Sequence, residues 1–105
     1  MPPMKLADAL PELVADLESA LAHLGRPDLV RQLRGLAIER WRYDDFSDTT
    51  YLALAAADVA EAERLSLYDE LGVNLDLDSR GRVVGLEILD GRDAASRLAQ
   101  GRSTQ

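Results

Sequence analysis

A single β-hairpin between residues 72 and 90 constrains the fold of this chain more than any other stretch of the sequence. Val73, Leu75 and Leu77 alternate with polar residues, which is the period-two pattern of a strand with one buried face. A turn follows, because Gly81 can adopt the left-handed backbone conformation that closes a short hairpin. The return strand is rich in apolar residues, namely Val83, Val84, Leu86, Ile88 and Leu89. This hairpin indicates a fold class, but it contains no motif that indicates a catalysed reaction.

The chain has 105 residues and no cysteine, so it is long enough for one domain and has no disulfide and no thiolate metal site. Its first residues lack the apolar run of a signal peptide. No later stretch approaches the roughly 20 apolar residues that a membrane span requires. We therefore expect a soluble, cytoplasmic protein that does not enter a membrane.

The formal net charge of -7 is unevenly distributed along the chain. Residues 1–42 hold six basic and six acidic residues, whereas residues 43–105 hold six basic and 13 acidic residues. An acidic surface repels phosphate backbones. A nucleic-acid partner is therefore unlikely for the C-terminal part.

The N-terminal residues predict a helical hairpin. Leucines recur at spacings of three and four between residues 6 and 24, and the acidic residues lie off this stripe. Pro11 fits only a first helical turn, Gly25 ends the helix, and Pro27 begins a second, shorter one. We expect this leucine stripe to pack against the rest of the chain or against another copy.

The middle of the chain predicts a second β-hairpin over residues 37–54, followed by an ambiguous stretch. Six alanines between Ala53 and Ala62 favour a helix from about residue 52 to residue 71. Against a helix, Leu65 and Leu67 alternate with polar neighbours, as in a strand. After Gly91, a short helix is expected through residue 98, followed by a frayed tail over residues 101–105.

Several motifs resemble a prokaryotic family catalogued as domain of unknown function 2283. They are Tyr43-Asp44 with Asp48, Tyr51-Leu52-Ala53-Leu54, Gly72-Val73-Asn74-Leu75-Asp76-Leu77-Asp78 with Gly81, and Val84-Gly85-Leu86-Glu87-Ile88-Leu89. The resemblance covers about residues 38–92 and implies a mainly antiparallel sheet, with strand, loop and strand over residues 52–71. It implies no catalytic residues, and it implies a likeness to the smaller partner in toxin–antitoxin-like gene pairs.

These observations together predict an α+β fold in one structural domain. A helical hairpin (residues 1–36) packs on an antiparallel sheet of four or five strands with a short C-terminal helix (residues 37–100), and residues 101–105 form a flexible tail.

Carboxylates near the hairpin ends are the first candidates for chemistry, because calcium and magnesium prefer several carboxylate ligands. Aspartate in a turn usually binds its own backbone, and alternating aspartates on a strand usually face solvent. We therefore expect no metal and no cofactor. The carboxylates considered are Asp44, Asp45, Asp48, Asp76, Asp78, Glu87 and Asp90.

Two further residues are candidates for a catalytic group. Glu87 lies in an otherwise apolar strand and would be a general acid or base if it were buried, or else an exposed residue paired with Arg40 or Arg42. His23, the only histidine, lies at a helix end without a nucleophile or second ligand nearby in sequence. We expect no catalytic residue in this chain.

The expected function is a non-enzymatic protein-interaction or dimerisation module, antitoxin-like in character. Because the helical hairpin covers only one sheet face, the opposite face should keep some apolar residues and form a homodimer or bind a heterologous protein. The alternative is a small metal-binding protein or enzyme that uses carboxylates at the hairpin ends. The expected interface residues are drawn from Trp41, Tyr43, Tyr51, Val83 and Leu89.

Overall fold

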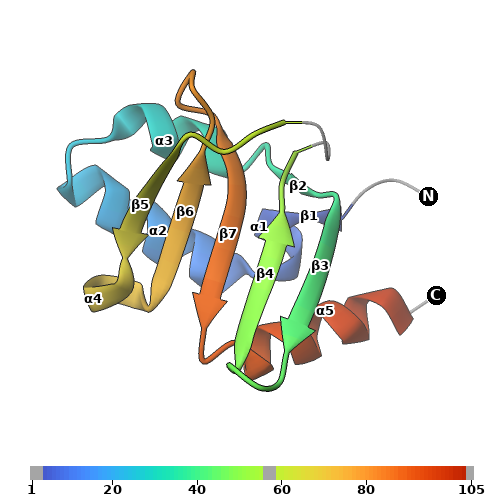
Figure 1. Cartoon of the computed structure of the whole chain (residues 1–105). Helices are drawn as coiled ribbons and strands as arrows, with labels where there is room; N and C mark the ends of the chain where they lie inside the picture. Colours follow the sequence, from blue (N-terminus) through green and yellow to red (C-terminus); the bar gives the residue numbers. More distant parts are fainter. Residues whose placement is uncertain (1–3, 56–58, 104–105) are drawn as a thin grey trace.

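Helices cover one face of a five-stranded antiparallel sheet in the computed structural model, which describes residues 4–55 and 59–103 (Figure 1). The strand order is β3-β4-β7-β6-β5, and every neighbouring pair is antiparallel. This arrangement confirms the predicted α+β class. The strands are β3 (Arg40–Asp44), β4 (Thr49–Ala53), β5 (Glu63–Leu67), β6 (Val73–Leu77) and β7 (Val83–Leu89).

The N-terminal layer contains three helices and a short second sheet. Pro11 and Pro27 occupy first-turn positions of α2 and α3, where a missing backbone donor has no cost, and Gly25 between them has φ +74°. The predicted helical hairpin is therefore present, with an extra single turn before it. The elements are β1 (Met4–Lys5), α1 (Leu6–Ala9), α2 (Pro11–His23), α3 (Pro27–Leu33) and β2 (Ala37–Ile38), with β1 paired to β2.

The leucine stripe of the helical layer packs against the sheet as one continuous core. Leu17 and Leu21 of α2 are fully buried, as is Leu75 on the facing strand β6. Leu24, which the spacing placed in the same stripe, is 46% exposed because it caps the end of α2. In the part of the chain that the structure describes, no helix is long and apolar enough to cross a membrane.

A polar side chain ties the helical layer to the sheet. Gln32 of α3 donates a hydrogen bond to the carbonyl of Gly81 (3.0 Å) and accepts one from the backbone of Val83 (2.9 Å). Gly81 has φ +78°, the left-handed conformation predicted for the turn between β6 and β7. The turn is therefore held both by its glycine and by contact with α3.

The alanine-rich stretch does not form the helix that propensity alone favours. Strand β4 ends at Ala53, and β5 begins at Glu63, so the implied strand, loop and strand are confirmed, while residues 56–58 lie outside the described residues. Leu67 of β5 is fully buried against the helical layer. Burial of the alternating leucines thus outweighs local helix propensity, and a single helical turn, α4 (Tyr68–Leu71), follows.

The C-terminal helix α5 (Arg92–Ser103) is longer than predicted. Its Leu98 is fully buried, and α5 packs on β3 and β4 near their hairpin end (Figure 1). Once a helix is anchored, each further residue adds one backbone hydrogen bond, which explains its continuation to residue 103. Residues 101–103 therefore belong to the helix, the flexibility of the tail stays a prediction, and residues 104–105 lie outside the described residues.

Candidate functional site on the open face of the sheet

The face of the sheet that carries no helix is called the open face here (Figure 1). Cross-strand register defines it: Arg42, Tyr51, Glu87, Asn74 and Ser66 form one row, and the neighbouring row of leucines faces the helices. The open face is polar and charged. Its side chains belong to Arg40, Arg42, Thr49, Tyr51, Ala53, Arg64, Ser66, Asn74, Asp76, Glu87 and Leu89.

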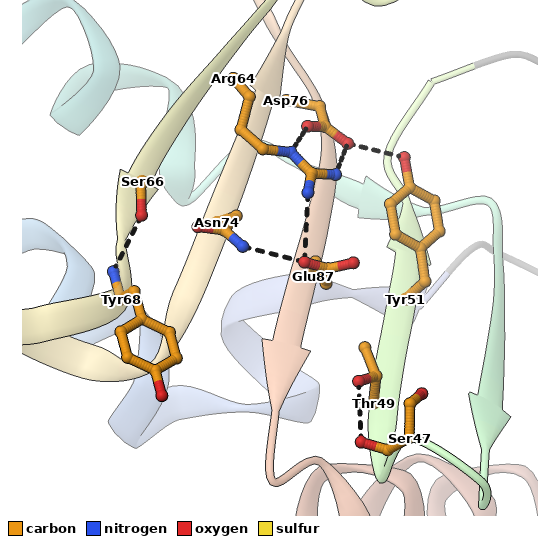
Figure 2. Close-up of polar contacts among 9 residues, drawn as sticks. All are labelled: Ser47, Thr49, Tyr51, Arg64, Ser66, Tyr68, Asn74, Asp76 and Glu87. Atoms are coloured by element: carbon orange, nitrogen blue, oxygen red, sulfur yellow. Dashed lines mark hydrogen bonds and ion pairs between the residues drawn. The ribbon is translucent and has the colours of Figure 1, made fainter.

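An arginine–carboxylate pair lies at the centre of the open face (Figure 2). Arg64 of β5 donates to both carboxylate oxygens of Asp76 on β6, from Nε at 2.8 Å and from Nη2 at 3.3 Å. Asp76 is only 1% exposed, whereas the Arg64 side chain is 46% exposed. The guanidinium therefore covers the carboxylate and neutralises a charge that would otherwise be buried without a partner.

The same arginine joins a second carboxylate to the network. Arg64 Nη1 lies 3.2 Å from Glu87 Oε1 on β7, and Asn74 Nδ2 donates to the same oxygen at 2.9 Å. The two carboxylates are thus bridged across three neighbouring strands (Figure 2). Glu87 is paired, as one alternative predicted, but its partner is Arg64 and not Arg40 or Arg42.

Tyr51 of β4 completes the network by lying across Gly85. Its hydroxyl donates to Asp76 Oδ2 at 3.2 Å. A Cβ atom on Gly85 would lie 2.9 Å from the ring carbon Cζ of Tyr51 and 3.2 Å from Asp76 Oδ2, which is too close for the ring. Glycine at position 85 therefore permits the tyrosine to reach the carboxylate.

The carboxylates of this network have perturbed pKa values. Burial alone would raise the pKa of Asp76, but hydrogen bonds from Arg64, Glu61 and Tyr51 outweigh burial and lower it. Glu61 shows the opposite shift, because its hydrogen bond to Asp76 and the negative charge there raise its pKa. The pKa values of the two interacting carboxyl groups are therefore shifted in opposite directions.

Two arginines on the edge strand β3 stand beside this network without an acidic partner. Within residues 4–55 and 59–103, the guanidinium groups of Arg40 and Arg42 form no ion pair with a carboxylate. Directly opposite on β4 lie Ala53 and Tyr51, and the Arg42 guanidinium lies 6.0 Å from the centre of the Tyr51 ring.

Three adjoining hollows run along β4 on the open face, and we call them together the trough. All three are lined by Arg42 and Tyr51, and their volumes are about 430, 310 and 320 Å³. The first reaches Ser47 at the β3–β4 turn, and the last reaches Val59 at the opposite end of the sheet. The trough therefore spans the length of the strand.

The five expected interface residues do not lie on one face. Tyr51 and Leu89 belong to the open face, whereas Trp41 and Val83 pack with the core, and Tyr43 shares the side of Trp41. Tyr43 also donates a hydrogen bond to Asp48 at 2.7 Å. Some of the five residues, namely Tyr51 and Leu89, thus lie on the open face, whose centre is polar, and the interface itself stays a prediction.

The carboxylates considered as metal ligands mostly shape turns. Asp44 accepts hydrogen bonds from the backbone of Phe46 (3.0 Å) and from Ser47, and Asp78 accepts from two backbone amides and from Arg82. In the described ranges, no group of three or more histidine, cysteine or carboxylate side chains is placed to hold a metal ion.

One expectation about these side chains needs correction, whereas His23 lies at a helix end as the sequence predicts. Asp76 and Asp78 are buried, 1% and 7% exposed, and do not face solvent as alternating strand aspartates usually do. His23 is exposed at the end of α2, on the helical layer and away from the open face. The sequence alone does not identify Arg64, because only the β5–β6 register brings it to Asp76, and Glu61, which precedes β5, is not identified either.

Comparison with known proteins bears on this sheet. No curated protein and no solved structure matches the chain. A family model described as "Protein of unknown function (DUF2283)" matches residues 40–91, which comprise all five strands of the large sheet. The match includes Tyr51, Asp76, Gly85 and Glu87 of the network, and it excludes the N-terminal helices. Residues 40–91 of this chain therefore belong to the DUF2283 family.

Proposed function

We propose that the protein is a non-enzymatic interaction module that binds a partner protein on the open face of its sheet. The observation that carries this proposal is the asymmetry of the sheet. One face is sealed by helices, and the other presents a trough along the whole of β4. A preorganised, uncovered face of this kind loses little conformational entropy when a partner docks.

The chemistry of the open face supports binding over catalysis. Asp76 and Glu87 are both engaged by Arg64, and Tyr51 already donates to Asp76. These side chains hold one another in place, and the sole histidine lies on another part of the molecule. Of the carboxylates that the enzyme alternative relied on, Asp76 and Glu87 are held in ion pairs, and Asp44 and Asp78 bind residues of their own turns.

An exposed aromatic residue at one end of the trough supports the same proposal. Phe46 in the β3–β4 turn is 97% exposed, and its backbone amide is held by Asp44. Aromatic side chains frequently anchor protein interfaces, because they bury a large area with few rotatable bonds. A partner that lies in the trough would meet this side chain at the hairpin end.

Homodimerisation remains a prediction within this proposal, and the antitoxin-like role remains one that rests on the family resemblance. A symmetric pair would bring two open faces together. A heterologous partner would use the same face once. One crosslinking experiment separates the two arrangements.

The test is site-specific photo-crosslinking of the full chain in its own host. A benzophenone amino acid replaces Ser66 or Leu89 on the open face, and the matched control positions are Asp8 and Arg31, which are exposed on the helical layer. We expect a discrete crosslinked protein from Ser66 and Leu89 only. Crosslinks to a second copy would identify a homodimer, and crosslinks confined to Asp8 and Arg31 would contradict the proposal.

A further inference from the structure

Arg40 and Arg42 place two positive charges on one wall of the trough in an otherwise acidic protein. The chain has 19 acidic and 12 basic residues, yet these two guanidinium groups have no acidic partner among the described side chains. Arg34 and Arg82 pair with Glu18 and Asp78, whereas Arg31 and Arg80 are also without an ion pair in the described part of the chain but do not line the trough. The open face therefore keeps two positive charges available at one wall of the trough.

The local geometry prevents the protein from neutralising these charges itself. The residues directly opposite Arg40 and Arg42 on β4 are Ala53 and Tyr51, neither of which is acidic. The nearest carboxylate in the same row is Glu87 on the next strand, where Arg64 and Asn74 hold it. Among the residues that the structure describes, no carboxylate forms an ion pair with Arg40 or Arg42, which leaves both guanidinium groups available to an anion of a partner.

We infer that the trough takes an extended, acidic segment of a partner protein, in which two carboxylates face Arg40 and Arg42. This inference rests on the proposed function and names the chemistry of the partner. Charge complementarity applies at the wall formed by Arg40 and Arg42, because the carboxylates that also line the trough, Asp44, Glu61, Asp76 and Glu87, would repel acidic side chains on its other parts. The long shape of the trough selects an extended backbone.

The spacing of the arginines adds a sequence requirement. They are two residues apart on one strand, so their side chains leave the same face about 6.6–6.8 Å apart. An extended segment repeats its side chains at the same interval. The partner should therefore carry acidic residues at positions i and i+2, with small or aliphatic residues between them.

Calorimetric titration of the purified full chain tests this inference. The probe is a capped seven-residue peptide of alternating glutamate and valine, and the matched control peptide has glutamine in place of glutamate. We expect the glutamate peptide to bind at least tenfold more tightly than the glutamine peptide at low salt, and we expect this preference to shrink as salt rises.

Matched variants locate the binding. The double variant Arg40→Glu with Arg42→Glu should lose the preference for glutamate. The control variant Arg31→Glu with Arg80→Glu makes the same change of net charge at exposed positions outside the trough and should keep the preference. Circular dichroism melting verifies that both variants are folded.

Several outcomes would overturn the inference. They are no binding, equal binding of both peptides, equal loss in both double variants, and inorganic phosphate or a single-stranded oligonucleotide binding as tightly as the peptide. If a partner crosslinks to the open face but any of these results is obtained, the proposed function stands and only the inference of an acidic segment is contradicted. Failure of the crosslinking itself would remove the proposed function instead.

Discussion

The two faces of the sheet are built by different physical means. On the covered face, Leu75 lies between Leu65 and Leu86 and is fully buried under the helices. On the open face, the adjacent positions carry Asn74 and Asp76, which are held by hydrogen bonds and an ion pair. Strand β6 thus contributes buried apolar side chains to one face of the sheet and hydrogen-bonded polar side chains to the other.

This difference separates stability from recognition. Burial of leucine is nondirectional and scales with area, and it involves no group that gains or loses a proton. The polar network depends on geometry, protonation and salt, and it orders side chains that a partner can contact. Variants of neighbouring residues on β6 should therefore behave differently.

The largest expected effect comes from the covered face. Leu75→Ala should destabilise the protein by about 2–5 kcal/mol, because it removes buried methyl groups and leaves a cavity. The matched change on the open face, Asn74→Ala, removes one hydrogen bond to Glu87 and should cost about 0.5–1.5 kcal/mol. Urea unfolding of both variants measures the contrast, and similar losses would mean that the two faces do not differ as described.

The next largest effect is expected at Arg64. Arg64→Ala leaves the carboxylate of Asp76 buried with only Tyr51 and Glu61 beside it, and the expected cost is about 2–3 kcal/mol. Equilibrium unfolding at low and high salt is the measurement. Since the guanidinium is half exposed, the loss should be smaller at high salt.

A double-mutant cycle sharpens this prediction. Arg64→Ala combined with Asp76→Ala should cost less than the two single changes added together, because the charge left buried by the first is removed by the second. Strict additivity would show that the pair does not act as a unit. It would then have no special part in ordering the open face.

A smaller effect is expected at Gly85. Gly85→Ala places a methyl group where the Tyr51 ring lies, so the ring must leave Asp76 and the variant loses one hydrogen bond to a carboxylate. We expect a cost of about 1.5–3 kcal/mol if the ring stays crowded, and less if it swings freely into the trough. Tyr51→Phe in the same background separates these cases. It should add no further loss once the hydroxyl has left Asp76.

Sequence reasoning predicted the architecture well, because the fold depends on periodic burial. The alternation of Val73, Leu75 and Leu77, the glycine of the turn and the leucine stripe of the helices are local patterns. They are confirmed as β6, the β6–β7 turn and the helical layer. The alanine-rich stretch needed the family resemblance, since its local propensity favours a helix.

The candidate site could not be predicted in the same way. Arg64 meets Asp76 only because β5 and β6 pair in one register, and Glu87 joins them only because β7 lies on the other side of β6. A shift of one residue would turn Arg64 to the covered face. The rule that alternating aspartates face solvent failed at Asp76, because the open face supplies its own cover from Arg64 and Tyr51.

The smallest expected effect is the contribution of the open-face pair Asp76 and Glu61 to the pH dependence of stability. The lowered pKa of Asp76 means that its ionised form stabilises the fold above its unfolded pKa, and this stability is lost as the pH falls through the lower folded pKa. The raised pKa of Glu61 acts in the opposite sense, since proton uptake there relieves repulsion with Asp76 as the pH falls. Arg64, Tyr51 and Glu87 are the other ionisable groups around this pair.

The urea midpoint of unfolding, measured across acidic pH, tests this prediction. Glu61→Gln should remove a gain in stability on mild acidification, whereas Asp76→Asn should remove part of the loss of stability at lower pH. Leu75→Ala should shift the whole curve down without changing its shape, and a changed shape there would mean that the two faces are coupled.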